Sequence, residues 1–221
     1  MANNRGAILM PAGLYIRNAN SIVQIDENYR NLVLLTKGSV PFGADWYDVT
    51  IGVPLGTVMI GLRSDRWIYV HESTIVGSGL LLTIRPGEPS AGGSIQYYAF
   101  GPAPAGAMGN CGCEIFDGSG QRVFHSDLNY WAYMDLAQPR SGDAFDRTYG
   151  ALPLVCQLGI STYISMYSEV DAFISTTYFK TLGNRVLTYY QSGIVGGSYP
   201  GNYTYGQDGA DLMILNGGKV Y

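Results

Sequence analysis

The chain has 221 residues and a net charge of −4, and charged residues make up 14% of it, against about 25% in typical soluble proteins. The acidic balance and the scattered arginines argue against nucleic-acid binding, which needs a basic stripe, and no apolar run reaches the ~18 residues of a membrane span. The 30 glycines and 18 tyrosines favour strands joined by tight turns.

The first half of the chain predicts a series of short strands. Segments rich in β-branched and aromatic residues recur about every 8–12 residues, with Gly- and Pro-rich turns between them. This spacing is typical of an antiparallel β-sandwich. The strands are expected at residues 8–16, 22–25, 32–36, 46–51, 57–62, 67–70, 80–84 and 95–100.

A Pro- and Ala-rich stretch after residue 100 reads as a linker. We therefore expect an N-terminal β domain over 1–100, a linker over 101–108 and a C-terminal β domain over 109–221. The second domain has further strand-like segments, whereas 137–150 is polar and predicts a loop. Its strands are expected at residues 112–117, 121–127, 129–136, 152–158, 163–167, 172–178, 185–190 and 212–215.

Both halves open with the same hairpin pattern. Residues 13–28 align with residues 112–127 at a constant shift of 99 positions, so that Asn18 matches Asp117 in the turn. One alternative is that any hairpin carries such turn residues. The preferred interpretation is a duplication, which gives an all-β fold of two tandem, duplicated, antiparallel β-sandwich-like domains.

Few residues offer catalytic or metal chemistry. His71 and His125 each lie in a strand-like segment, next to Glu72 and near Asp127 respectively, and a single strand histidine is more often structural. The Cys111-x-Cys113 pair is too closely spaced for the C-x₂₋₄-C of a usual zinc site. We expect free thiols, and no catalytic, cofactor or metal site.

Two carboxylate pairs have a spacing open to glycosidase chemistry, which needs two carboxylates facing each other across a cleft. The candidates are Asp143 with Asp146, which resemble turn caps, and Glu169 with Asp171, which share one strand face. A polysaccharide-degrading enzyme is therefore disfavoured.

The region from residue 189 to residue 207 is rich in Tyr, Gly and Asn, the composition of recognition loops. It predicts a contact surface for a receptor, a sugar or a neighbouring subunit. The alternative is a loop that folds back on its own sheet. The candidate contact residues are Tyr189, Tyr190, Tyr199, Asn202, Tyr203 and Tyr205.

The hairpin segments resemble the opening of small minor tail proteins of long-tailed bacteriophages. The pattern is a Gly-aliphatic-x-aliphatic strand, an Asx-x-x-Gly turn and a strand ending in Asp, here Gly112 to Asp127. The first copy, Gly13 to Asp26, has Ser21 where Gly is usual. The resemblance implies a β-rich protein at or near the tail tip, beside the central fibre.

The resemblance and the low charge together predict a non-enzymatic virion structural protein of a phage tail tip or baseplate. Its expected partners are other tail proteins, further copies in a three- or six-fold homo-oligomer, and a host surface receptor. The N-terminus lacks the apolar core of a signal peptide, so synthesis in the host cytoplasm and localisation in the virion tail are expected. The alternatives are a capsid decoration protein and a carbohydrate-binding module that uses Trp46, Trp67 or Trp131.

Overall fold

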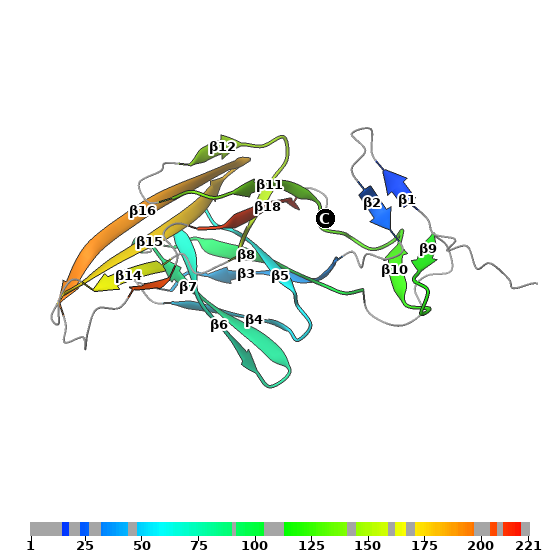
Figure 1. The fold of residues 1–221 in the computed structure, drawn as a ribbon, viewed down its shortest axis with the longest axis horizontal. Coiled ribbons are helices and arrows are strands. Elements are labelled where there is room, and N and C mark those ends of the chain that lie inside the picture. Colours follow the sequence, from blue (N-terminus) through cyan, green and yellow to red (C-terminus); the bar gives the residue numbers. More distant parts are fainter. Residues whose placement is uncertain are drawn as a thin grey trace, which may run out of the picture. The chain divides into compact units, whose positions relative to one another are not determined.

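Every regular element that the structure describes is a β-strand, and every strand pairing is antiparallel (Figure 1). The all-β fold predicted from the sequence is therefore confirmed. Within the described part of the chain, no helix is long and apolar enough to cross a membrane. The structure is a computed structural model and describes residues 15–17, 23–26, 32–43, 48–89, 92–103, 113–140, 145–158, 162–166, 171–196, 204–206 and 210–217.

The chain divides into two compact units, each built from two separate stretches of sequence. The smaller unit comprises Met1–Asn31 and Ala103–Leu128, and the larger comprises Leu32–Pro102 and Asn129–Tyr221. Each unit is described by itself below.

The smaller unit contains two hairpins of the same design. In each hairpin the first residue of the first strand lies opposite the last residue of the second strand, and the register shifts once, close to the turn. The shift of 99 residues maps one register onto the other, so both predicted hairpins are present and match strand for strand. The strands are β1 (Tyr15–Arg17), β2 (Val23–Asp26), β9 (Glu114–Phe116) and β10 (Arg122–His125).

The larger unit is built from two antiparallel sheets. The six-stranded sheet has the order β11 (Tyr133–Ala137), β18 (Leu212–Asn216), β13 (Pro153–Gln157), β5 (Met59–Arg63), β8 (Ser94–Gly101) and β3 (Val33–Pro41). The eight-stranded sheet contains β12 (Asp146–Thr148), β16 (Arg185–Gly196), β15 (Asp171–Leu182), β6 (Ile68–Val76), β7 (Gly79–Pro86) and β4 (Val49–Pro54) in that order, with β14 (Thr162–Met166) on β15 and β17 (Thr204–Gly206) on β14.

The two halves of the chain contribute the same strand order to these sheets. The first half supplies β3-β8-β5 to one sheet and β4-β7-β6 to the other, and the second half supplies β11-β18-β13 and β12-β16-β15. Corresponding strands meet where the halves join. The pairing there is short: Leu62 lies opposite Val155 between β5 and β13, and Ile68 lies opposite Phe179 between β6 and β15.

The compact units therefore differ from the expected division at 101–108. The linker region separates two repeats of one strand order, but the strands of both repeats share two common sheets. Left alone, the strands of the first half would end in open edges at β5 and β6. An open edge exposes unpaired N–H and C=O groups, and here the second half covers part of both edges.

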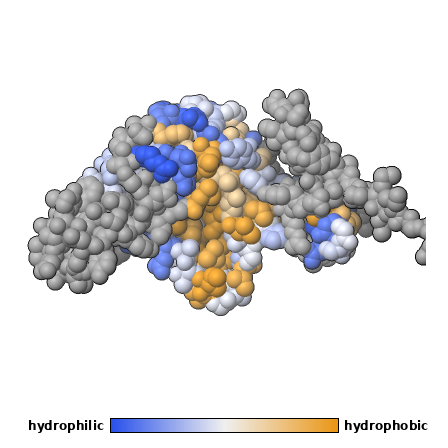
Figure 2. Space-filling model, viewed as in Figure 1, coloured by the Kyte–Doolittle hydropathy of each residue, from blue (hydrophilic) through white to orange (hydrophobic). Residues whose placement is uncertain are grey.

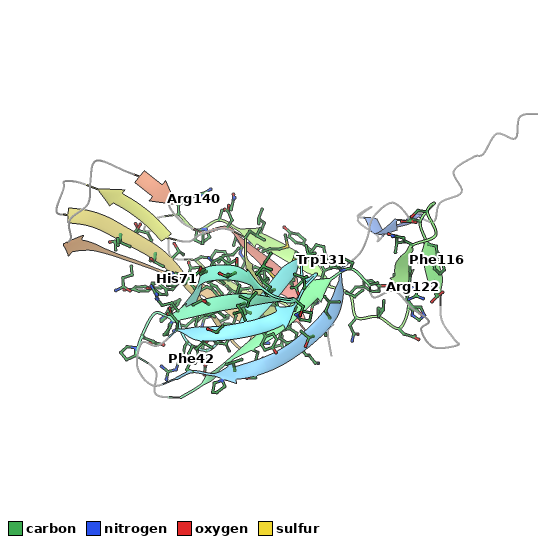
Figure 3. The ribbon with its side chains drawn as sticks, turned by 90° about the horizontal axis from the view of Figure 1, so that it is seen from below. Phe42, His71, Phe116, Arg122, Trp131 and Arg140 are labelled. Carbon is green, nitrogen blue, oxygen red and sulfur yellow. The ribbon has the colours of Figure 1, made fainter. Side chains whose placement is uncertain are left out.

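The hydrophobic core lies between the two sheets, which pack face to face. Leu62 and Ile214 project into it from the six-stranded sheet, and Ile84 and Phe179 from the eight-stranded sheet. Figure 3 shows side chains filling this interlayer space. Alternation along the strands explains the arrangement, since every second residue faces the opposite sheet.

A second apolar cluster lies on the other face of the six-stranded sheet. Phe100 and Leu154 are fully buried there. The cluster is partly covered by Leu34 and by Trp131, which Figure 3 labels. This sheet is therefore apolar on both faces, which accounts for near-continuous apolar runs such as that in β13.

Candidate functional site

Tyr189 lies on the outer face of the eight-stranded sheet. The two-residue turn Gly183–Asn184 sets the register of the β15–β16 hairpin, and this register places Tyr178 opposite Tyr189. Phe179 faces the core, so its neighbour Tyr178 must face outward. Tyr189 is 46% exposed, as a contact residue requires.

Tyr189 belongs to a row of packed aromatic side chains on this face, which we call the aromatic row. Its ring centroid lies 5.6 Å from Trp67 and 6.4 Å from Tyr178. Tyr178 packs edge-on against Tyr69 at 5.0 Å, and Tyr69 packs edge-on against His71 at 5.8 Å. Edge-to-face and tilted pairs at these separations are favourable, so the buried Tyr69 and Tyr178 hold the exposed Tyr189 in place.

Charged groups lie at both sides of the aromatic row. The Arg85 guanidinium donates two hydrogen bonds to Asp48, at 2.8 and 2.9 Å, and a longer one of 3.4 Å to the Tyr69 hydroxyl. The Lys180 ammonium lies 4.2 Å from the Trp67 ring centroid, within the range of a cation–π interaction. The row therefore combines an exposed aromatic ring, that of Tyr189, and the half-buried ring of Trp67 with charged groups held in fixed positions.

Two pKa values show how the row is held. The hydrogen bonds from Arg85 lower the pKa of Asp48, so the carboxylate stays charged and accepts both bonds. Burial raises the pKa of Tyr178 to about 12, with the Tyr69 hydroxyl as a smaller cause. The Tyr178 phenol is therefore neutral at physiological pH.

Of the six contact residues predicted from the sequence, the described part of the chain places only Tyr189 on this face. Tyr190 follows Tyr189 in β16 and lies on the opposite face of the sheet, because it pairs with the inward-facing Thr177. Tyr205 lies in β17, where only the backbone is described. The remaining predicted residues lie outside the described part of the chain: Tyr199, Asn202 and Tyr203.

Sequence reasoning missed the partners of Tyr189. The alternation of the strand around Trp67 predicts core packing, and the carbohydrate-binding alternative predicts an exposed ring. The ring lies outside the interlayer core, half-buried beneath Lys180. The Gly183–Asn184 turn was the available signal for pairing Tyr178 with Tyr189. Nothing local indicates that β6, more than a hundred residues earlier, completes the row.

A groove adjoins the His71 end of the aromatic row, where both sheets split at the junction of the two halves. Its volume is about 380 Å³, and its walls come from β6 and β7 on one side and from β5 and β13 on the other. Several apolar side chains near it are exposed, including Val58 at 65% and Ile75 at 70%. Figure 2 shows a continuous apolar band over this part of the larger unit.

The histidines have structural partners. The Nδ1 atom of His71 lies 3.4 Å from the Tyr69 hydroxyl. His125 is buried in the β9–β10 hairpin, where its Nε2 atom lies 3.2 Å from Glu114 and its Nδ1 atom accepts a hydrogen bond from the Asp127 N–H. Arg122, labelled in Figure 3, also lies 3.0 Å from Glu114.

The carboxylates and cysteines considered above form no assembled site in the described ranges. Asp146 pairs with Arg185 across β12 and β16, and Cys113 is an exposed free thiol. In those ranges no three His, Cys, Asp or Glu side chains gather as metal ligands. Three of the candidate metal and carboxylate residues lie outside the described part of the chain: Cys111, Asp143 and Glu169. Asp171 is described only in its backbone.

No protein family, curated protein or solved structure matches the chain.

Proposed function

We propose that the chain is a non-enzymatic structural component of a phage tail tip or baseplate, which acts through its surfaces and binds the host as well as neighbouring tail proteins. The observation that carries the proposal is the pair of hairpins, β1–β2 and β9–β10, with the same register and the same irregularity. These are the segments whose sequence resembles minor tail proteins. A hairpin retained in both halves suits a repeated attachment element.

The surface chemistry supports an assembly role. Charged residues are scarce, and exposed apolar side chains gather around the groove, among them Leu55, Val58 and Ile75. Exposed apolar patches of this kind mark interaction sites in soluble proteins. We infer a homo-oligomer, because closed rotational symmetry buries the same patch in every copy, and the proposed tail location makes its symmetry three- or six-fold.

Immunogold electron microscopy of particles from the source, with antibody against this chain, tests the location. We expect label at the tail tip. Label on the head would replace the proposal with capsid decoration. Absence of label from intact particles, with the protein abundant in infected cells, would contradict a virion role, provided that detergent-opened particles are also unlabelled.

The aromatic row favours one second candidate function, saccharide binding. Tyr and Trp faces stack on sugar rings, and the Arg85–Asp48 pair beside the row offers hydrogen-bonding groups. A carbohydrate-binding surface is compatible with attachment to a host glycan. Saccharide binding by this surface does not require the protein to be part of a virion.

A glycan array tests this second function with the isolated protein. We expect binding that Tyr189→Ser abolishes and that the control Tyr133→Ser leaves intact, since Tyr133 is also exposed but lies in the other sheet. Equal loss in both variants, or no binding by the wild type, would contradict saccharide binding through the aromatic row.

A further inference from the structure

The eight-stranded sheet forks where β6 leaves β15. The two strands pair only at Ile68 and Phe179. Beyond that point β14 takes the edge of β15, along residues 172–176. These are the positions that β6 would reach if it continued in the same antiparallel register. The second part of β6, residues 71–76, is therefore left paired with β7 alone, and all six residues are exposed.

The hairpin geometry identifies which backbone groups point away from β7. Val76 and Gly79 flank the two-residue turn of the β6–β7 hairpin and form a hydrogen-bonded pair. Alternation then directs the N–H and C=O groups of Thr74 toward β7, and those of Ser73 and Ile75 toward the open side. No described residue bonds these outward groups of Ser73 and Ile75.

One side chain already occupies this edge as a strand would. The Oε1 atom of Gln157 accepts the Val70 N–H at 2.9 Å, and its Nε2 atom donates to the Val70 C=O at 3.1 Å. The side-chain amide of glutamine has the same N–H donor and C=O acceptor as a peptide unit. The contact therefore reproduces the pair of hydrogen bonds of an antiparallel ladder. The edge of β6 is thus already arranged to pair with an amide.

Beyond Glu72, the free part of β6 also lacks the features that keep other edges unpaired. Proteins protect edge strands with charges and prolines. The edge strand β3 has Lys37 and Pro41, β4 ends in Pro54, and β12 has Arg147. Residues 73–76 of β6 are Ser-Thr-Ile-Val, with neither charge nor proline. Such an edge is built to be paired.

The groove lies beside this edge and has room for side chains. Ser73 and Leu80 line its β6–β7 wall, and Ile60 and Leu158 line the opposite wall. Its volume of about 380 Å³ falls in the usual range of ligand sites, ~300–1,000 Å³. Alternate side chains of a strand added beside β6 would point into it, because cross-strand neighbours share one face.

We propose that β6 binds one extended segment of a partner polypeptide as an added strand, with its inward apolar side chains in the groove. The occupant is a single extended strand, because the edge lies inside the fork between β6 and β15. A sheet edge of another folded domain does not readily enter this fork, since the rest of that domain would collide with its sides. In the same fork the edge of β15 is already covered by an added strand, β14, which pairs with the short β17 on its other side. Backbone hydrogen bonds give such complexes their affinity, and pockets for alternate side chains give them specificity.

The test is a selection of displayed random linear peptides against the full chain, followed by binding titrations with two matched variants. Ser73→Pro removes one outward N–H without touching the ladder to β7, a position where proline is tolerated. Ser73→Ala changes the side chain and retains the N–H. For each selected peptide, a copy methylated at the backbone nitrogens that face β6 is titrated against the wild type.

We expect peptides with alternating apolar residues to bind the wild type and Ser73→Ala alike. Ser73→Pro and the methylated copy should each weaken binding about tenfold, as the loss of one or more backbone hydrogen bonds implies. Failure to select any peptide, or equal binding of the methylated copy, would overturn the proposal. The methylated peptide is titrated against the wild type, so it tests the proposal even if Ser73→Pro does not fold. Neither titration depends on whether the protein is located in a phage tail.

Discussion

Gly87 is the residue on which the packing of the aromatic row depends. A Cβ atom at this position would lie 2.6 Å from the Tyr178 ring and 3.0 Å from the Cβ of Trp67. Tyr178 is buried and packs edge-on against Tyr69, so its ring has little room to retreat. We expect Gly87→Ala to lower the free energy of unfolding by about 1–3 kcal/mol, as overpacking does.

Urea denaturation followed by tryptophan fluorescence measures this effect. Gly150→Ala is the matched control, because nothing lies within 4 Å of the added atom, and we expect it to stay within about 0.5 kcal/mol of the wild type. A Gly87→Ala protein as stable as the Gly150→Ala protein would show that the row is loosely packed.

Asp48 gives the same face a dependence on pH. Hydrogen bonds from Arg85 lower its pKa in the folded state, so the pair stabilises the fold above the unfolded-state pKa of about 3.9 and this contribution is lost as pH falls through the lower, folded value. The pair is partly exposed and screened by solvent, so its contribution is about 0–1 kcal/mol. We expect the stability difference between wild type and Asp48→Asn to shrink below about pH 4, as measured from urea midpoints. A difference that stays constant from neutral to acid pH would contradict this assignment.

At the scale of elements, Asp117 fixes the turn of the β9–β10 hairpin. Its Oδ1 atom accepts hydrogen bonds from the N–H groups of Ser119 and Gln121, both at 2.9 Å. We expect Asp117→Ala to reduce the local stability of the hairpin by about 1–2 kcal/mol, and Asp117→Asn to retain most of it. Hydrogen exchange at the Asp117 N–H, which bonds the Gln121 C=O, reports the change. Equal exchange in the two variants would mean that the backbone alone holds the turn.

Elements with local signals could be predicted from the sequence, and those held by distant partners could not. The turn residues of both hairpins predict them correctly. By contrast, 137–150 was expected to be a loop, yet it contains β12, a polar strand held by pairing with β16 and by the Asp146–Arg185 ion pair. The strand expected at 67–70 runs on to Val76. The sequence does not predict this continuation, because a bulge near His71 interrupts the alternation of the strand.

The candidate site shows the same limit. Composition indicated Tyr189, but its ring partner Trp67 comes from the other half of the chain. The contact follows from the join between β6 and β15, which consists of one residue pair. Long-range register of this kind leaves no periodicity in the sequence, so the aromatic row and the groove are both features that only the assembled sheets reveal.

At the scale of the whole molecule, the larger unit should fold without the smaller one. The chain passes between the units three times, and within the larger unit all three connections end close to Val33, which pairs with Gly101 on one side and with Tyr130 on the other. Two strand spacings separate these partners, about 10 Å, which a linker of about four Gly/Ser residues can span. A variant that starts at Leu32 and replaces 103–128 with this linker therefore retains both sheets and both buried clusters.

We expect this variant to unfold in one cooperative transition, with a Tm within a few degrees of the main transition of the full chain. Calorimetry and far-ultraviolet circular dichroism measure it. The matched control deletes 1–31 only and keeps 103–128, so it removes β1–β2 without introducing the linker or removing β9–β10. If the control folds and the linked variant does not, the cause is the linker or the loss of β9–β10. If both lose the strand signal, the hairpins contribute to the stability of the sandwich, and the two repeats of the strand order depend on the hairpins that precede them.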